Sequence, residues 1–255
     1  MEPTVRRTNW RALLKSWDAQ QASFNPGRER RFQAMFDLLE AALPRRFSAL
    51  DLGSGPGSLS VRLLRRFPQA QAVAVDYDPV TQRIGRGALG TFGGRLTWVD
   101  ADLGSPGWTA RLPSARFDAA VSTTALHWLS EPRLRSLYRD LVHRLARGGV
   151  FLNGDHLPWG TASPWLDSID LRVWRRRVHG QSPRGKPEWR RWWANAKKVP
   201  ALRPYFRERA RRAAEHPKHR PPSLEVHEDA LARAGFREVD VVWQDFGDRV
   251  LFARR

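Results

Sequence analysis

A glycine-rich loop is the first feature of this sequence that could do chemistry. The stretch "LDLGSGPGSLS" places Gly53, Gly55 and Gly57 after a short apolar run. A phosphate-binding P-loop would end in Gly-Lys-Ser/Thr, but Ser58 and Leu59 follow the last glycine. A dinucleotide fingerprint has the spacing G-x-G-x-x-G, which puts Ser58 where the third glycine belongs. The loop therefore predicts a nucleotide-like ligand that is not gripped as a P-loop grips phosphate.

Carboxylates at the ends of three successive predicted strands indicate the charge of that ligand. Asp51 precedes the loop, where it would repel a pyrophosphate and attract a cation, although it could also cap a helix. Asp76 in "VAVDYD" can bind both ribose hydroxyls, and Tyr77 can pack on an adenine. Asp102 in "WVDADL" can accept the adenine amino group, with Asp100 as the alternative. These acids favour S-adenosylmethionine, which carries an ammonium and a sulfonium but no phosphate.

Two histidines follow later predicted strands, His127 in "TTALHWL" and His156 in "NGDHL". Methyl transfer from a sulfonium needs the acceptor atom roughly 3–3.5 Å from the methyl carbon. It needs a base only if the acceptor must lose a proton, and imidazole suits that task near neutral pH. We predict both histidines as catalytic candidates, with Asp155 as a candidate partner that orients His156. The alternatives are packing of His127 beside Trp128, or a reaction without a base.

The elements that must position these residues alternate as in a doubly wound, Rossmann-like α/β fold. Apolar periodicity predicts two N-terminal helices over 9–24 and 28–43. Strands are expected at 49–52, 70–75, 95–101, 118–122, 149–155, 237–246 and 249–255. The last two flank a Gly-Asp turn, so the seven-stranded sheet should end on an antiparallel strand. The predicted parts are N-terminal helices over 1–44, a core over 45–157 and 223–255, and an insertion over 158–222.

The insertion is rich in tryptophan and arginine. From Arg172 to Arg220 it holds 17 basic and 3 acidic residues, in a chain of net charge +18. Six tryptophans lie in it: Trp159, Trp165, Trp174, Trp189, Trp192 and Trp193. We expect an α-helical cap over the acceptor, whose tryptophans would suit an aromatic molecule and whose charge would suit an acidic one. The alternative is a set of helices with an apolar face and a solvated basic face.

Composition excludes several classes of protein. The chain has no cysteine, which rules out disulfides, thiolate metal sites and cysteine nucleophiles. The histidines show no metal-binding spacing, so no metal is expected. No apolar run is long enough to span a bilayer, and the N-terminus lacks the apolar core of a signal peptide, so we expect a cytoplasmic protein without a membrane partner. No feature indicates an oligomeric state.

These motifs resemble, in order, those of class I S-adenosylmethionine-dependent methyltransferases of the small-molecule type, with a methyltransferase domain 25-like core. The matching segments are "LDLGSGPG", "VDYD", "DADL", "FDAAVSTTALHWL", "ARGGVFLNGDH" and "LARAGF…VLFARR", covering roughly 28–157 and 223–255. The resemblance implies a methyltransferase that uses S-adenosylmethionine and acts on a small molecule, and we expect it to work in secondary metabolism by O- or N-methylation. The cofactor-binding residues predicted on this basis are Asp51, Gly53, Ser54, Gly55, Gly57, Asp76, Tyr77, Asp102, Leu103 and Thr123.

Two further points concern the ends of the expected site. The resemblance implies that N-terminal helices can close over the methionine tail, which makes Gln20 and Gln21 candidates, while Trp10 and Trp17 suit helix packing. Basic charge interleaved with aromatic residues also fits an RNA methyltransferase. Against that interpretation, "TTALHWL" stands where amino-directed nucleic-acid methyltransferases carry Asn/Asp-Pro-Pro-Tyr/Phe/Trp. A protein that binds S-adenosylmethionine without methylating is the third class.

Overall fold

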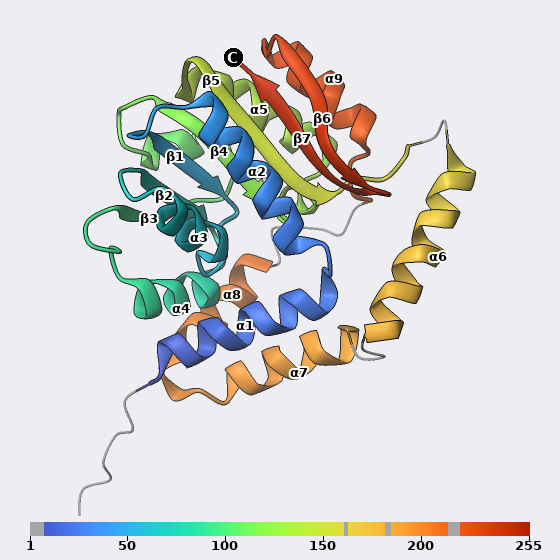
Figure 1. Ribbon diagram of the computed structural model, residues 1–255. Helices are drawn as coiled ribbons and strands as arrows, with labels where there is room; N and C mark the ends of the chain where they lie inside the picture. Colours follow the sequence, from blue (N-terminus) through green and yellow to red (C-terminus); the bar gives the residue numbers. More distant parts are fainter. Residues whose placement is uncertain (1–7, 161–162, 182–184, 214–219) are drawn as a thin grey trace, which may run out of the picture.

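The computed structural model describes residues 8–160, 163–181, 185–213 and 220–255. Their central feature is a seven-stranded sheet in the order β3-β2-β1-β4-β5-β7-β6, with helices on both faces (Figure 1). The first five strands pair in parallel, and β7 runs antiparallel between β5 and β6. The doubly wound sheet and its antiparallel last strand, both expected from the sequence, are confirmed.

The strands lie within two residues of the predicted ends, except that β5 begins earlier. Their bounds are β1 Ser48–Leu52, β2 Gln71–Asp76, β3 Leu96–Asp100, β4 Phe117–Thr123, β5 Leu145–His156, β6 Glu238–Asp245 and β7 Asp248–Arg254. Because parallel strands end at the same edge of the sheet, the predicted acids and histidines gather along one edge. That edge is where an open α/β sheet binds its ligand.

Helices cover the two faces of the sheet and form its core. On one face, Met35 and Leu39 of α2 (Arg28–Ala42) and Leu63 of α3 (Ser58–Arg66) pack on the strands. On the other, Leu137 of α5 (Glu131–Arg144) and Leu231 of α9 (Leu224–Ala234) do the same. Successive strand residues point to opposite faces, so strands buried on both sides must be apolar throughout. This explains the continuous apolar runs of the sequence.

Part of the insertion packs against the N-terminal helix and against the helix that follows β2. α7 (Gly185–Lys197) runs beside α1 (Trp10–Phe24), and α8 (Arg203–Ala213) lies against α4 (Pro79–Leu89) (Figure 1). Their contacts form a separate apolar cluster that includes Leu14, Val80, Ile84, Trp192, Trp193 and Leu202. For these two tryptophans the structure shows the packing role that was the alternative to a ligand-lining one.

The remaining insertion helix, α6 (Pro164–Gln181), stands apart from the sheet beside the β6–β7 hairpin (Figure 1). Arg177 joins it to Asp245 at 2.8 Å, and His156 approaches Asp170 at 3.5 Å. The insertion therefore has two parts: α7 and α8 pack against α1 and α4, and α6 lies beside the hairpin and also touches α1. Among the described residues, no helix is long and apolar enough to cross a membrane.

Candidate functional site

The glycine loop turns the chain sharply between β1 and α3. Gly53, Gly55 and Gly57 all have positive φ, at 71°, 54° and 82°, a conformation that glycine adopts without a steric penalty. The backbone N–H groups of Gly53 and Ser54 both donate to the carbonyl of Val75, at 2.8 and 3.0 Å. The loop is thereby fixed against the end of β2, and its backbone faces the sheet edge free of bulky side chains.

One carboxylate oxygen of Asp51 is hydrogen-bonded to the start of α3, and the other has no partner among the described residues. Its Oδ2 accepts hydrogen bonds from the backbone N–H and the hydroxyl of Ser60, at 3.0 and 2.6 Å, so it does cap α3. Its Oδ1 is buried with no hydrogen-bond partner in the described part of the chain. Burial raises the pKa of this carboxyl to about 6. An unpaired buried carboxylate oxygen is costly, and a cationic ligand would remove that cost.

Asp76 ends β2 and binds the loop directly. Its Oδ2 accepts the N–H of Gly55 at 2.6 Å, and its Oδ1 accepts the N–H of Asp78 at 2.7 Å. Burial and the nearby Asp78 carboxylate raise its pKa to about 7. Each carboxylate oxygen has a second lone pair, so both oxygens can still accept ribose hydroxyls.

The two acids near the end of β3 have different surroundings. Asp102 lies in a local turn, where its oxygens accept the N–H of Gly104 at 2.8 Å and the hydroxyl of Ser105 at 2.6 Å. Asp100 stands directly opposite Asp76 in the β2–β3 register. Asp100 therefore lies closer in the sheet to the predicted ribose-binding acid than Asp102 does. Which of the two acids faces an adenine stays a prediction, with Asp102 preferred and Asp100 as the alternative.

Helix α1 covers the glycine loop. A side chain at Gly55 would contact the ring of Trp17 at 4.0 Å, and Asp18 accepts the hydroxyl of Ser58 at 2.7 Å. Gln20 is buried, and neither its amide nitrogen nor its oxygen has a partner among the described residues. The hydroxyl of Ser54 is also buried and unpartnered in that part of the chain. Such groups suit a ligand that carries both a cation and a carboxylate.

The unpaired groups fit the amino-acid end of S-adenosylmethionine. Its ammonium could donate to Asp51 Oδ1, and its carboxylate could accept from Ser54 Oγ or the Gln20 amide. Of the other predicted contacts, Leu103 is buried in the core below the sheet edge, and Thr123 ends β4. These assignments remain predictions, as do those of Gly53, Gly57 and Tyr77.

His127 and Asp155 form a pair at the ends of β4 and β5. The imidazole Nδ1 lies 2.9 and 3.0 Å from the two oxygens of Asp155, which is buried. Burial opposes a charge on His127, but the Asp155 carboxylate outweighs it and raises the pKa of the ring. Burial would likewise raise the pKa of Asp155, and His127 and Arg31 hold it below its usual range. With Nδ1 bound to Asp155, Nε2 is the ring nitrogen left for an acceptor.

The structure corrects the expected partner of His156. Asp155 bonds the ring of His127 and the backbone N–H of His156, while the His156 ring lies 3.5 Å from Asp170 of α6. Adjacent residues of a strand point to opposite faces, so Asp155 could not orient the ring of His156. The two histidines therefore have different surroundings: His127 lies at the sheet edge beside Asp155, and His156 lies beside α6.

Arg31 was not anticipated as part of this edge. Its guanidinium is buried and donates to the carbonyl of Gly154 at 2.8 Å and to the hydroxyl of Thr124 at 3.3 Å, and it lies 3.2 Å from Asp248. It thus joins the ends of β4, β5 and β7 beside the His127–Asp155 pair. Arg31 lies in the segment "RERRF" at the start of a predicted helix, and nothing in that segment distinguishes it from the exposed Arg30.

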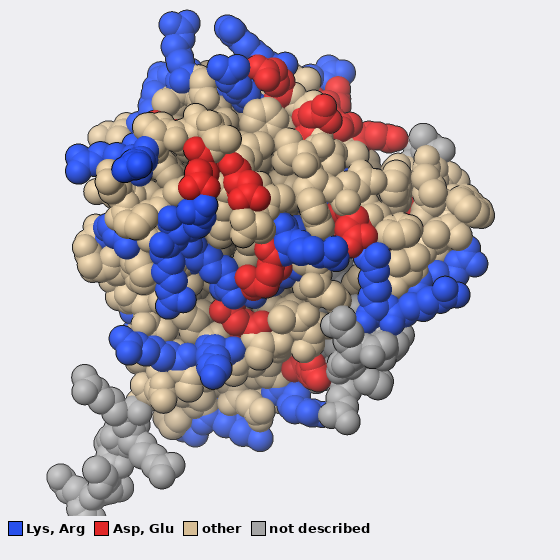
Figure 2. Space-filling model, in the orientation of Figure 1, with Lys and Arg blue, Asp and Glu red and all other residues tan. Residues whose placement is uncertain are grey.

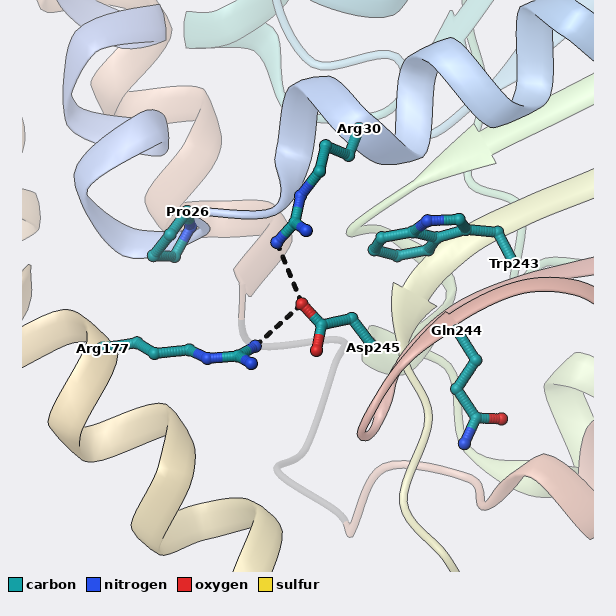
Figure 3. A pocket seen from close by; sticks show the side chains of 6 residues that line it. All are labelled: Pro26, Arg30, Arg177, Trp243, Gln244 and Asp245. Atoms are coloured by element: carbon teal, nitrogen blue, oxygen red, sulfur yellow. Dashed lines mark hydrogen bonds and ion pairs between the residues drawn. The ribbon is translucent and has the colours of Figure 1, made fainter.

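A cleft of about 500 Å³ opens between α6, the start of α2 and the β6–β7 hairpin (Figure 3). Asp245 lies between Arg30 at 2.9 Å and Arg177 at 2.8 Å, with Trp243 beside them (Figure 3). A smaller adjoining cavity shares these charged residues and reaches His156. The cleft therefore leads from solvent toward the end of β5.

Comparisons with known proteins show what part of the chain is similar to. Residues 49–149 match the family model described as a methyltransferase domain. Trans-aconitate 2-methyltransferase of Azoarcus sp. (strain BH72) is 33% identical over 138 residues, 54% of this chain and 49% of that protein. The protein of the same name from Streptomyces coelicolor is 31% identical over 179 residues, 66% and 55% of the two chains. The matched part spans about half the length of these curated relatives.

Solved structures share the fold at lower identity. A structure of PigF with S-adenosylhomocysteine has a TM-score of 0.54 at 16% identity, covering 83% of this chain and 51% of that one. Human N-acetylserotonin methyltransferase with S-adenosylmethionine gives 0.52 at 16% identity, covering 92% and 58%. The strand order, the matched segment and these relatives lead to one conclusion: residues 49–149 belong to a methyltransferase domain, within a chain that has the Rossmann-like fold of class I methyltransferases.

Proposed function

We propose that this chain methylates a carboxylate oxygen of a small acidic acceptor, with S-adenosylmethionine as the donor, to give a methyl ester. The observation that carries the proposal is the His127–Asp155 pair at the sheet edge, whose geometry holds an imidazole of raised pKa beside the predicted donor site. The relatives named for trans-aconitate support a carboxylic acid as the acceptor.

The donor supplies a methyl group that its own sulfonium charge has already activated. Asp51, Ser54 and Gln20 would hold its amino-acid end, and Asp76 would hold its ribose. Because these groups come from β1, the glycine loop, α1 and β2, the donor would be enclosed on several sides. Enclosure of this kind fixes the position of the reacting carbon, which is the main task of the protein in a displacement reaction.

His127 suits a carboxylate acceptor better than a proton-bearing one. Asp155 raises the pKa of the ring, which increases the fraction of imidazolium relative to an ordinary histidine, and it orients the ring through Nδ1. The Nε2–H could then donate to a carboxylate, which needs no base because it has already lost its proton. At the outer end, Arg30 and Arg177 converge on one carboxylate, Asp245, and a second carboxylate of the acceptor could compete for the same guanidinium groups.

The RNA alternative has less support. Several arginines of the insertion form ion pairs with acids of the core, among them Arg177 with Asp245 and Arg209 with Asp78. Figure 2 shows basic and acidic side chains interspersed over the face in view rather than a single basic surface. Counterion release by nucleic acid depends on basic groups that are available to phosphates, and paired arginines contribute less to it.

The test is a methyl-transfer assay with a panel of acceptors. We expect base-labile methyl esters, identified by mass spectrometry, with one or more of trans-aconitate, citrate and benzoate. His127→Asn should lower the rate, and His143→Asn, which replaces an exposed histidine of α5, serves as the matched control. Methylation of tRNA, or only of phenols and amines that lack a carboxylate, would contradict the proposal. Donor binding without any methylated product would indicate the non-methylating class.

A further inference from the structure

Two guanidinium groups from separate helices converge on one carboxylate oxygen in the cleft (Figure 3). Arg30 of α2 and Arg177 of α6 donate to Oδ2 of Asp245, the last residue of β6, at 2.9 and 2.8 Å. The side chain of Asp245 is 18% exposed, whereas those of Arg30 and Arg177, the arginine pair, are 67% and 45% exposed. Because a guanidinium has five N–H donors and Asp245 takes one from each arginine, the pair has further donors for a second carboxylate.

Aromatic rings of the β6–β7 hairpin support the arginine pair. The guanidinium of Arg30 lies 5.9 Å from the centre of the Trp243 ring, and that of Arg177 lies 5.3 Å from the centre of the Phe246 ring. A guanidinium is planar and weakly hydrated, so an aromatic face can hold it without using its N–H donors. These contacts do not involve Asp245, and they can keep both groups in place when another carboxylate binds them.

The cleft is connected to the edge of the sheet that carries His127. The adjoining cavity is lined by the arginine pair and also by Asp248. Asp248 lies 3.2 Å from Arg31, which donates to the ends of β4 and β5 beside the His127–Asp155 pair. An elongated acceptor could therefore place one carboxylate near the His127 ring and a second carboxylate at the arginine pair.

The acids along this path have basic neighbours. Asp248 pairs with Arg31, and Asp170 lies 3.5 Å from the ring of His156. Asp245 differs from them, because it has two basic partners and both are exposed at the cleft. Its negative charge cancels part of the positive charge that would attract an anionic acceptor. A carboxylate that binds the arginine pair must therefore share the pair with Asp245 or displace Asp245 from it.

We propose that the arginine pair binds a second carboxylate of the acceptor and that Asp245 is an internal competitor for this site. The proposal rests on the proposed methylation of a carboxylate, and it adds the residues that select among carboxylic acids. A second carboxylate would gain charge-assisted hydrogen bonds from both arginines, and a monocarboxylate would gain none. Asp245 would reduce that gain, because two carboxylates at one site repel each other. If Asp245 were only a staple between α6 and the hairpin, its loss would loosen the site for every acceptor.

The experiment measures acceptor binding by calorimetry on the full chain loaded with S-adenosylhomocysteine. The two acceptors are crotonate and glutaconate, which is crotonate with a second carboxylate on its last carbon. We expect glutaconate to bind about tenfold or more tightly. Arg30→Gln and Arg177→Gln should each lose most of that preference. Asp245→Asn should instead increase it by about threefold, because the competing charge is gone. Arg176→Gln, a change at the exposed neighbour of Arg177, should leave the preference unchanged.

Asp245→Asn should have no effect on the preference in a variant that lacks both arginines, since the competitor acts only through the pair. Weaker binding of both acceptors by Asp245→Asn, or a ratio that neither arginine change alters, would overturn the inference while the proposed function stands. Equal binding, or no measurable binding, of the two acceptors by the unaltered protein would do the same. If Arg30→Gln does not fold, the opposite effects expected of Arg177→Gln and Asp245→Asn decide the matter. Failure to form a methyl ester from any carboxylic acid would overturn the proposed function and this inference together.

Discussion

Replacing Asp76 by asparagine should remove a pH dependence from the stability of the ligand-free protein, so that the unaltered protein gains stability relative to the variant as the pH falls. Asp76 is 9% exposed, and burial together with Asp78 raises its pKa from 3.8 to about 7. A group with a raised pKa in the folded state adds stability below its unfolded pKa, and that contribution disappears as the pH rises through the folded pKa. Asparagine has the same shape and no such dependence.

The pKa values set the size of this effect. Between pH 8 and pH 7 the carboxylate is mostly ionised in both states, and little changes. From pH 7 to pH 5 the folded Asp76 takes up a proton, whereas the unfolded aspartate stays mostly ionised. Each pH unit of that range corresponds to about 1.4 kcal/mol. The free energy of unfolding of the unaltered protein should therefore gain about 3 kcal/mol relative to Asp76→Asn between pH 8 and pH 5.

Urea unfolding of both proteins without donor, at pH 5 and pH 8, measures this difference directly. Titrating groups that do not interact with Asp76 are present in both proteins and cancel in the comparison. Asp37→Asn, a change at an exposed aspartate of α2, controls for the substitution itself. If the stability difference between Asp76→Asn and the unaltered protein is the same at both pH values, the buried carboxylate does not have the raised pKa on which the reasoning depends.

Three other perturbations test the site. His127→Asn should lower turnover tenfold or more, on the order of 1.4 kcal/mol, with unchanged calorimetric affinity for the donor; a loss of donor affinity would mean that the ring shapes the donor site instead. With a carboxylate acceptor, kcat/KM should fall as the pH rises through the raised pKa of His127. Asp155→Asn should move the midpoint of this pH profile to lower pH, because Asp155 raises that pKa. A rate that instead rises with pH would identify His127 as a base that removes a proton. Gly57→Ala should lower the free energy of unfolding by about 2 kcal/mol or more, because φ is +82° and the new Cβ would lie 2.7 Å from Trp98. Gly55→Ala is the control, since its new Cβ meets no such close contact. Equal losses of stability for the two variants in chemical denaturation would refute the steric argument.

The sequence predicted the parts of the fold that depend on local pattern. Strand positions follow from short apolar runs, and the antiparallel β7 follows from the turn before Asp248. The placement of acids at strand ends followed from topology alone. The sequence could have shown that Asp155 does not contact the His156 ring, because adjacent residues of a strand point to opposite faces of the sheet. The contacts of Arg31 and Arg212 were not, since each joins segments more than 90 residues apart and nothing local marks either arginine.

Two arginines of the insertion lie beside the acids of the predicted donor site. A site that attracts a cation gathers carboxylates at one edge, and those carboxylates repel one another; burial raises the pKa of Asp76 most, and the Asp78 carboxylate raises it further. Arg209 and Arg212 meet Asp78 and Asp100 at the outer side of this group, where they offset part of the repulsion. The unpaired oxygen of Asp51, farther in along β1, is left for the ligand. Arginines placed there would lower affinity for a cation, whereas arginines at the outer acids can hold the edge together without competing for it.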